Sequence, residues 1–127
     1  MVASLGTIRF TLFEMTDKIL VLSTCASADE AEKLARLLVE RRLAACVSVV
    51  PQARSYFRWK GEVEMADECL LLIKSARELF EPLRAAIEAE HSYETPEVVA
   101  IPILAGARGY LNWMDANLET GREPVAE

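Results

Sequence analysis

The sequence predicts a single α+β domain in which two strand–helix–strand units are joined through a β-hairpin. Short apolar runs typical of buried strands alternate with amphipathic helical patterns, and a glycine turn separates two strand-forming segments. The 127 residues suffice for one core, because a chain of this length buries roughly two-thirds of its unfolded surface. We expect this domain over residues 15–127. Residues 1–14 differ in residue pattern from the segment that follows, and we interpret them as an N-terminal extension, native or introduced by cloning.

The first half of the domain predicts a strand, a helix and a second strand. Residues 19–22 form an apolar run of the kind that is buried on both faces of a sheet. Ser27 and Glu30 then form an S-x-x-E capping box, whose hydroxyl and carboxylate satisfy free amides at a helix start. Apolar residues at helical spacing extend this helix over residues 28–42. The small and β-branched residues 43–51 predict the second strand.

A long hairpin follows. Gly61 lies in W-K-G-E with strand-forming residues on both sides, so residues 55–75 are expected to turn back and end in the apolar run 69–73. Ser75 and Glu78 repeat the capping-box spacing and predict the start of a second helix. Pro82 lacks an amide and is expected to kink or loosen the first turns of that helix.

The last part of the domain predicts a loop, an edge strand and a short helix. Residues 91–97 are polar and contain Thr95-Pro96, which favours a loop. Residues 98–104 predict a fourth strand, and Pro102 within it indicates an edge or a bulge. Apolar residues at helical spacing after Gly106 predict a C-terminal helix.

This order, βαββαβ followed by a helix, is the ferredoxin-like split βαβ pattern. The helices of such a fold lie on one face of the sheet, yet residues 19–22, 70–73 and 98–104 present apolar side chains to both faces. One short C-terminal helix cannot cover the second face. We therefore expect an obligate oligomer joined sheet to sheet, with Trp59 and Trp113 as core or interface anchors.

Composition excludes several classes of function. Lys plus Arg number 14 against 20 Asp plus Glu, and the net charge of −6 argues against nucleic acid as a partner. No apolar run reaches eighteen residues, and the N-terminal stretch lacks a basic region followed by a continuous apolar one, so we expect no membrane span and no export. The three cysteines fit neither a disulfide framework nor a C-x-x-C chelate, which favours reduced thiols in a cytoplasmic protein. The common catalytic motifs are absent from the sequence, so we expect no enzyme; a small hydrolase stays a third hypothesis without a nameable nucleophile.

A soft or borderline metal prefers imidazole or thiolate ligands, and the chain has one histidine and three cysteines. The candidate metal ligands are His91, Cys25, Cys46 and Glu94. Each has a structural alternative. His91 would be a hydrogen-bond donor at a helix C-terminus, each cysteine a packed core residue, and Glu94 part of a Thr-Pro turn that fixes the entry into the fourth strand. The carboxylates of the hairpin are interpreted as a solvated face; they are Glu62, Glu64, Asp67 and Glu68.

Five segments carry a family resemblance. They are L-A-A-C-V at 43–47, a stretch from Ser55 to W-x-G at 59–61, L-I-K-S at 72–75, H-x-Y-E-T-P-E at 91–97 and Y-L-N-W at 110–113. In this order and spacing, over about residues 18–118, they resemble the CutA divalent-cation tolerance proteins. The resemblance implies a ferredoxin-like fold, a cytoplasmic homotrimer similar to the PII signalling proteins, and a link to copper and other divalent metals. It implies no obligate cofactor and no known enzymatic reaction.

At the positions of the family's metal ligands, this sequence departs from the family pattern. Some members carry a cysteine and a His-His pair at the positions of Ser23, Glu90 and His91, and only His91 matches. Ser92 stands where proline is usual. The function expected from the resemblance is divalent-cation tolerance with weak copper binding near His91, in a cleft between subunits. The alternative hypothesis is a PII-like sensor that holds a small anionic ligand between subunits through Arg54, Arg58 and Lys60.

Overall fold

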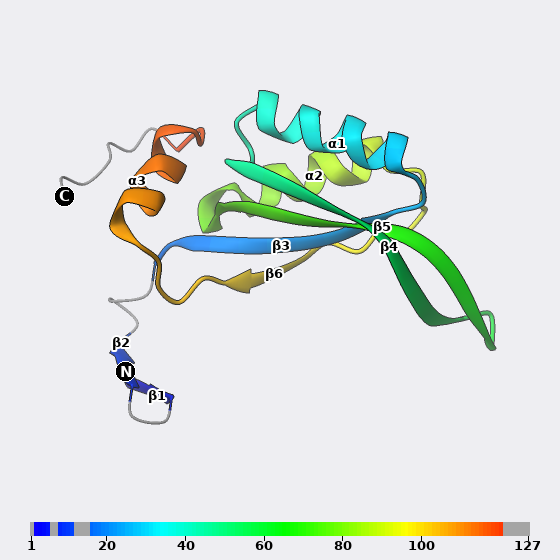
Figure 1. The fold of residues 1–127 in the computed structure, drawn as a ribbon, viewed down its shortest axis with the longest axis horizontal. Coiled ribbons are helices and arrows are strands. Elements are labelled where there is room, and N and C mark those ends of the chain that lie inside the picture. The colour runs from blue at the N-terminus through cyan, green and yellow to red at the C-terminus, as the bar shows by residue number, and fades with distance from the viewer. Residues whose placement is uncertain (1, 6–7, 12–15, 121–127) are drawn as a thin grey trace.

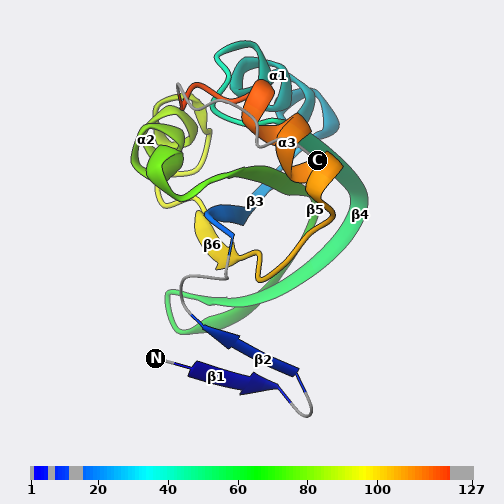
Figure 2. The same cartoon turned by 90° about the vertical axis from the view of Figure 1, so that its left-hand side faces the viewer.

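The computed structural model describes residues 2–5, 8–11 and 16–120. Its main unit is an antiparallel sheet of four strands in the order β4-β5-β3-β6, which is the ferredoxin-like order that the sequence predicts. The strands are β3 (Lys18–Cys25), β4 (Cys46–Trp59), β5 (Glu62–Ala76) and β6 (Val99–Pro102). Helices α1 (Ala28–Glu40) and α2 (Phe80–Glu90) lie on one side of the sheet, and α3 (Arg108–Ala116) packs at one end (Figures 1 and 2). Strands β1 (Val2–Leu5) and β2 (Ile8–Thr11) pair with each other within the segment interpreted as an extension.

Helix α1 starts at the predicted capping box. The Ser27 Oγ accepts a hydrogen bond from the Glu30 amide at 3.2 Å, and the Glu30 carboxylate accepts one from the Ala26 amide at 3.3 Å. The helix ends at Glu40, slightly earlier than predicted. Arg42 follows in the left-handed region with φ 59°, which terminates the helix and turns the chain toward β4.

The second predicted capping box is wrong. Strand β5 continues through Ser75, whose buried Oγ donates a hydrogen bond to the Leu43 carbonyl at 2.6 Å and so is not available to a helix. A 3-10 turn, η1 (Arg77–Leu79), leads into α2, which has no side-chain cap. Pro82 lies in the first turn of α2, where amides have no partner within the helix, so its missing N–H removes no helical bond.

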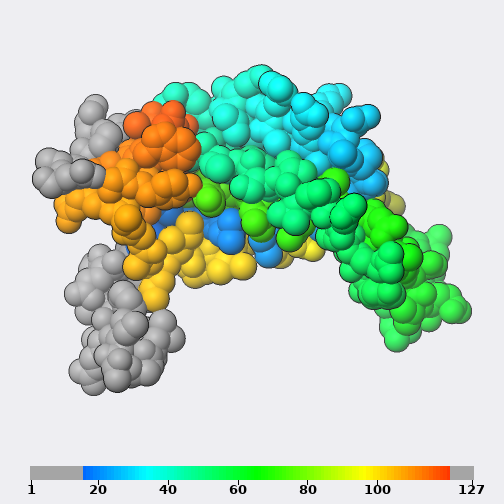
Figure 3. Space-filling view, in the orientation of Figure 1, coloured from blue at the N-terminus to red at the C-terminus, as the bar shows by residue number. Residues whose placement is uncertain are grey.

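Strands β4 and β5 form a longer hairpin than the sequence predicts. Lys60 and Gly61 both take left-handed backbone angles, φ 51° and 82°, between the paired Trp59 and Glu62. Such a two-residue turn matches the twist of the strands that it joins. A bulge between Val50 and Ala53 interrupts the pairing, and beyond it the hairpin projects from the body as an arm (Figure 3).

The helix side of the sheet holds the main core. Its largest buried apolar side chains come from β3, β5, α1 and α2; they are Val21, Leu71, Ile73, Leu38, Leu83 and Ile87. Along β3, buried and half-buried residues alternate, as expected for a strand that covers two environments.

The opposite side of the sheet, which we call the open face, carries apolar side chains as predicted. Leu20, Leu22, Leu70 and Leu72 are half-buried there, and Val99 and Ile101 of β6 are 49% and 47% exposed. Among the described residues, no helix covers the open face (Figure 1). Pro102 lies at the edge of the sheet, because β6 pairs only with β3, and its edge position is confirmed.

Helix α3 closes one end of the sheet. Met114 and Leu118 pack with Ala45, Ala76 and Leu79 in a second small core. The Lys18 ammonium, 3% exposed, lies 2.8 Å from an Asp115 carboxylate oxygen and 2.5 Å from one of Asp17. These ion pairs fasten α3 to the start of β3.

Candidate functional site

Several connections of the fold meet at the end of the sheet that lies opposite α3. Strand β3 ends there at Cys25 and α1 begins two residues after Ala26, while α2 ends there and leads into the loop that starts at His91. Strand β5 passes the same place with Glu68 and Cys69, opposite the bulge of β4. The topology therefore gathers thiol, imidazole and carboxylate side chains that are far apart in the sequence.

His91 is the centre of this group, and its imidazole side chain is fully buried. The Nδ1 accepts a hydrogen bond from the Tyr93 amide at 3.0 Å, so the proton of a neutral ring is on Nε2. The Nε2 then donates to the Thr24 carbonyl at 2.6 Å, and the Cys25 Sγ lies 3.8 Å from the same nitrogen. The Nε2 bond thus ties the loop to the end of β3, and the Nδ1 bond fixes the ring within the loop.

Glu30 links the start of α1 to the same loop. Its carboxylate accepts hydrogen bonds from the Ser92 amide at 2.7 Å and the Ser92 hydroxyl at 3.0 Å, and it lies 3.8 Å from the His91 Nδ1. Burial opposes ionisation, but the two bonds from Ser92 and the nearby His91 outweigh it and lower the pKa of Glu30. The capping residue of the sequence analysis is therefore also a site residue.

Tyr93 and Glu68 form a second link, which sequence reasoning missed. The Tyr93 phenol donates a hydrogen bond to the Glu68 carboxylate at 2.7 Å, and its ring lies 4.7 Å from the imidazole of His91. Glu68 is only 9% exposed, so the interpretation of the hairpin carboxylates as a solvated face is wrong for this residue. The other three hairpin carboxylates are exposed. The only signal in the sequence was that Glu68 directly precedes an apolar run.

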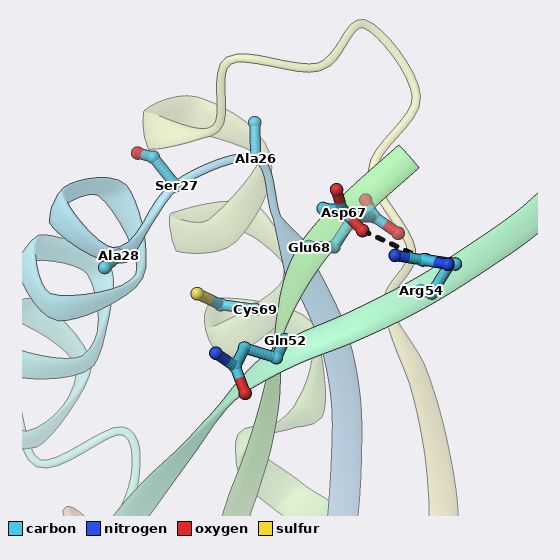
Figure 4. Close-up of a pocket in the computed structure, with 8 residues that line it drawn as sticks. All are labelled: Ala26, Ser27, Ala28, Gln52, Arg54, Asp67, Glu68 and Cys69. Carbon is cyan, nitrogen blue, oxygen red and sulfur yellow. Dashed lines mark hydrogen bonds and ion pairs between the residues drawn. The ribbon is translucent and has the colours of Figure 1, made fainter. Parts of the chain in front are cut away.

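An open cleft of about 750 Å³ borders this group (Figure 4). Its lining comes from the start of α1 and from the facing stretches of β4 and β5: Ala26, Ser27, Ala28, Gln52, Arg54, Asp67, Glu68 and Cys69. Arg54 makes a 3.4 Å ion pair with Asp67 across the hairpin. The cleft therefore offers both a cation and carboxylates to a visiting molecule.

The two thiols at this end differ in access to solvent. Cys25 is fully buried, and burial together with the Glu30, Cys69 and Glu68 charges raises the pKa of its thiol to about 12. Cys69 is 6% exposed and borders the cleft. At neutral pH Cys25 is therefore a protonated thiol, not a thiolate.

The predicted metal ligands are only partly brought together. Cys25 and His91 are in contact, whereas Cys46 pairs with Lys74 at the other end of the sheet and Glu94 is exposed on the loop. Within the described ranges, no three His, Cys, Asp or Glu side chains are grouped so as to hold a metal ion. The cations of the alternative hypothesis are also separated: Arg54 lines the cleft, while the Arg58 guanidinium donates to the Gly61 carbonyl at the tip of the arm.

In the part of the chain that the structure describes, no helix is both long and apolar enough to cross a bilayer.

The fold and the site define a class: a small ferredoxin-like α+β protein with a buried thiol–imidazole–carboxylate group at one end of its sheet.

Comparison with known proteins identifies the family within this class. The model of the CutA1 divalent ion tolerance protein family matches residues 19–117, so the chain belongs to this family. The chain is 46% identical to the divalent-cation tolerance protein CutA of Thermus thermophilus over 97 residues, which span 76% of this chain and 94% of that protein. Its CutA relative in Archaeoglobus fulgidus is 42% identical over 96 residues, 76% and 93% of the two chains.

Solved structures agree in fold. The Cut A1 structure from Thermus thermophilus matches with a TM-score of 0.78 at 44% identity, over 80% of this chain and 98% of that one. The CutA1 structure from Oryza sativa matches with a TM-score of 0.81 at 33% identity, over 85% and 99% of the two chains. The family and the ferredoxin-like fold inferred from the sequence are thereby confirmed.

Proposed function

We propose that the protein is a non-enzymatic cytoplasmic homotrimer that binds copper(II) or another divalent cation weakly at Cys25 and His91. The observation that carries the proposal is the 3.8 Å approach of the Cys25 Sγ to the His91 Nε2, a thiol and an imidazole of the kind that copper prefers. The Glu30 carboxylate beside the ring supplies negative charge. Names of relatives that refer to divalent-cation tolerance support the same function.

Binding at this pair is expected to be weak for two structural reasons. The metal must replace the Thr24 carbonyl as the partner of the His91 Nε2, which breaks a 2.6 Å hydrogen bond. It must also displace the proton of Cys25, whose pKa is raised to about 12 by burial and by nearby negative groups. Because metal binding releases that proton, copper affinity should increase with pH.

The test is a copper(II) titration by equilibrium dialysis with metal analysis, because a weak complex would dissociate on a gel-filtration column. Wild-type protein should retain copper, and His91→Ala and Cys25→Ala should lose it. Cys46→Ser is the matched control, because Cys46 is a second thiol of the same sheet that lies away from His91. Copper that is retained in His91→Ala, or lost in Cys46→Ser, would reject the proposed pair. Copper retained by none of the proteins would also reject it.

Trimer formation is supported by the open face. Its half-buried leucines and the exposed Val99 and Ile101 form an apolar sheet surface without a cover in the described chain. Trp59 and Trp113, which are 51% and 44% exposed, lie outside the core and fit the interface role expected of them. Light scattering at micromolar concentration should give a trimer mass. Leu22→Glu should lower that mass, whereas Val39→Glu on the exposed side of α1 should leave it unchanged.

A second function is favoured by Arg54 in the cleft. A small anionic ligand, as in a PII-like sensor, would meet this guanidinium near the start of α1. Thermal stabilisation by members of a panel of nucleotides and organic acids would support it, because a ligand that binds only folded protein raises the melting temperature. Arg54→Gln should abolish the stabilisation, and Arg58→Gln at the tip of the arm should not.

A further inference from the structure

Cys25 and Cys69 are direct partners across β3 and β5. The antiparallel register places Cys25 opposite Cys69, and both side chains belong to the core on the helix side of the sheet. Residues that face each other in an antiparallel pair have Cα atoms about 4.5 or 5.5 Å apart, depending on the hydrogen-bonding position. A disulfide accepts Cα separations of about 4.4–6.8 Å. The backbone therefore already meets the distance that a bridge requires.

We propose that Cys25 and Cys69 form a reversible cross-strand disulfide, which makes this pair a redox modification site. Cys46, the third cysteine, cannot replace either partner in this disulfide. It lies on β4 opposite Lys74, at the other end of the sheet. All three cysteines are free in the structure, so the reduced state is the one described.

The two cysteines have different parts in the reaction. Cys69 borders the open cleft (Figure 4) and is reached first, whereas Cys25 is fully buried. The Cys69 sulfur, as thiolate, attacks a low-molecular-weight disulfide such as oxidised glutathione, forming a mixed disulfide and releasing one thiol. The Cys25 thiol then gives up its proton to solvent as its sulfur attacks the Cys69 sulfur. The protein disulfide forms, and the second small-molecule sulfur leaves as a thiolate and takes up a proton. Two electrons pass from the protein thiols to the small disulfide, and the two thiol protons end on its two products.

The bridge would change the neighbouring site. The Cys25 sulfur would turn from the His91 Nε2 toward β5, and the thiol donor that now lies 3.8 Å from the imidazole would be lost. The inference does not rest on the proposed function, since it needs only the two thiols. If copper does bind at Cys25 and His91, oxidation would switch that binding off.

The experiment uses the full chain in glutathione buffers of increasing oxidised fraction. Samples are quenched with acid, alkylated in denaturant and measured by intact mass and peptide mapping. We expect two of the three thiols to escape alkylation in the oxidised buffers and one peptide to join Cys25 to Cys69. Addition of a strong reductant should restore all three thiols. This readout contains no copper, so failure of the copper proposal leaves it unchanged.

Two variants sharpen the test. Cys46→Ser should form the same bridge as wild type, and Cys25→Ala should stop at a glutathione adduct on Cys69. Full alkylation of wild type in the most oxidised buffer would overturn the proposal. A bridge that contains Cys46, or a stable glutathione adduct on wild-type Cys69, would overturn it as well. Wild type and Cys46→Ser alone decide the question if Cys25→Ala does not fold.

Discussion

The phenol of Tyr93 and the carboxylate of Glu68 join the loop after α2 to β5 through a 2.7 Å hydrogen bond. Burial, followed by the Glu68 carboxylate, raises the pKa of Tyr93, so the phenol stays protonated and keeps donating at neutral pH. Tyr93→Phe leaves the buried Glu68 without this donor and should lower the free energy of unfolding by about 1–3 kcal/mol. Urea unfolding at neutral pH measures the change.

Tyr56→Phe is the control for that prediction. Tyr56 lies on the arm and is 67% exposed, so loss of its hydroxyl should leave stability unchanged within about 0.5 kcal/mol. Equal effects of the two substitutions would mean that the Tyr93–Glu68 bond does not stabilise the folded state.

Ser23 and Ser75 should respond to alanine with opposite signs. Both are fully buried, but the Ser23 Oγ has no hydrogen-bond partner among the described residues, whereas the Ser75 Oγ donates to the Leu43 carbonyl. Ser23→Ala removes an unpaired hydroxyl and should raise the melting temperature. Ser75→Ala removes this donor from the half-buried Leu43 carbonyl and should cost about 1–3 kcal/mol. Calorimetry gives the melting temperatures of the two variants and of wild type. A lower melting temperature for Ser23→Ala would contradict the interpretation that its hydroxyl is unpaired.

Glu30 should make stability fall in acid. Its pKa is lowered in the folded state from the ordinary value of 4.5, so its contribution is complete above that value and is lost as the pH falls through the folded pKa. Wild type should therefore exceed Glu30→Gln in stability at neutral pH, and the difference should shrink below about pH 4.5. Glu32→Gln, at an exposed ion pair of the same helix, should show little difference at any pH. A difference between wild type and Glu30→Gln that did not depend on pH would exclude this role.

Lys18 should control the attachment of α3. Lys18→Met removes the buried ammonium from its pair with Asp115, and breaking a buried pair in this way costs about 3–5 kcal/mol. Hydrogen exchange of α3 amides should speed up more than that of α1 amides. The exposed Lys33 of α1 provides the control, since Lys33→Met removes the same charge at the surface. Unchanged exchange in α3 would show that the apolar contacts of Met114 and Leu118 are sufficient.

Local patterns were enough to predict the order of the elements, because apolar periodicity and turn residues act within a few positions. The capping box at Ser27, the turn at Gly61 and the edge position of Pro102 are each fixed by the chemistry of one or two residues. The capping box predicted at Ser75 was wrong, because a serine hydroxyl hydrogen-bonds to whichever partner the fold brings near. Here that partner is the Leu43 carbonyl, 32 positions away.

The site was less accessible to sequence reasoning, because it depends on strand register. His91 and Cys25 are 66 positions apart, and their contact follows from where β3 ends and α2 stops. If the register moved by one residue, the Cys25 and Cys69 side chains would point to opposite faces of the sheet and would no longer pair. The chemistry of the individual side chains therefore identified some candidates. Which of them lie together could be seen only in the structure.

The ion pair of Lys18 with Asp115 also bears on how this domain can be rearranged in the laboratory. It places the start of β3 beside the end of α3, so a short peptide joining those two ends would span little distance. The exposed Lys60–Gly61 turn at the tip of the arm then becomes a natural place to open the chain. A circular permutant of this kind would carry its new ends, and any fused reporter, on the arm and away from the cleft.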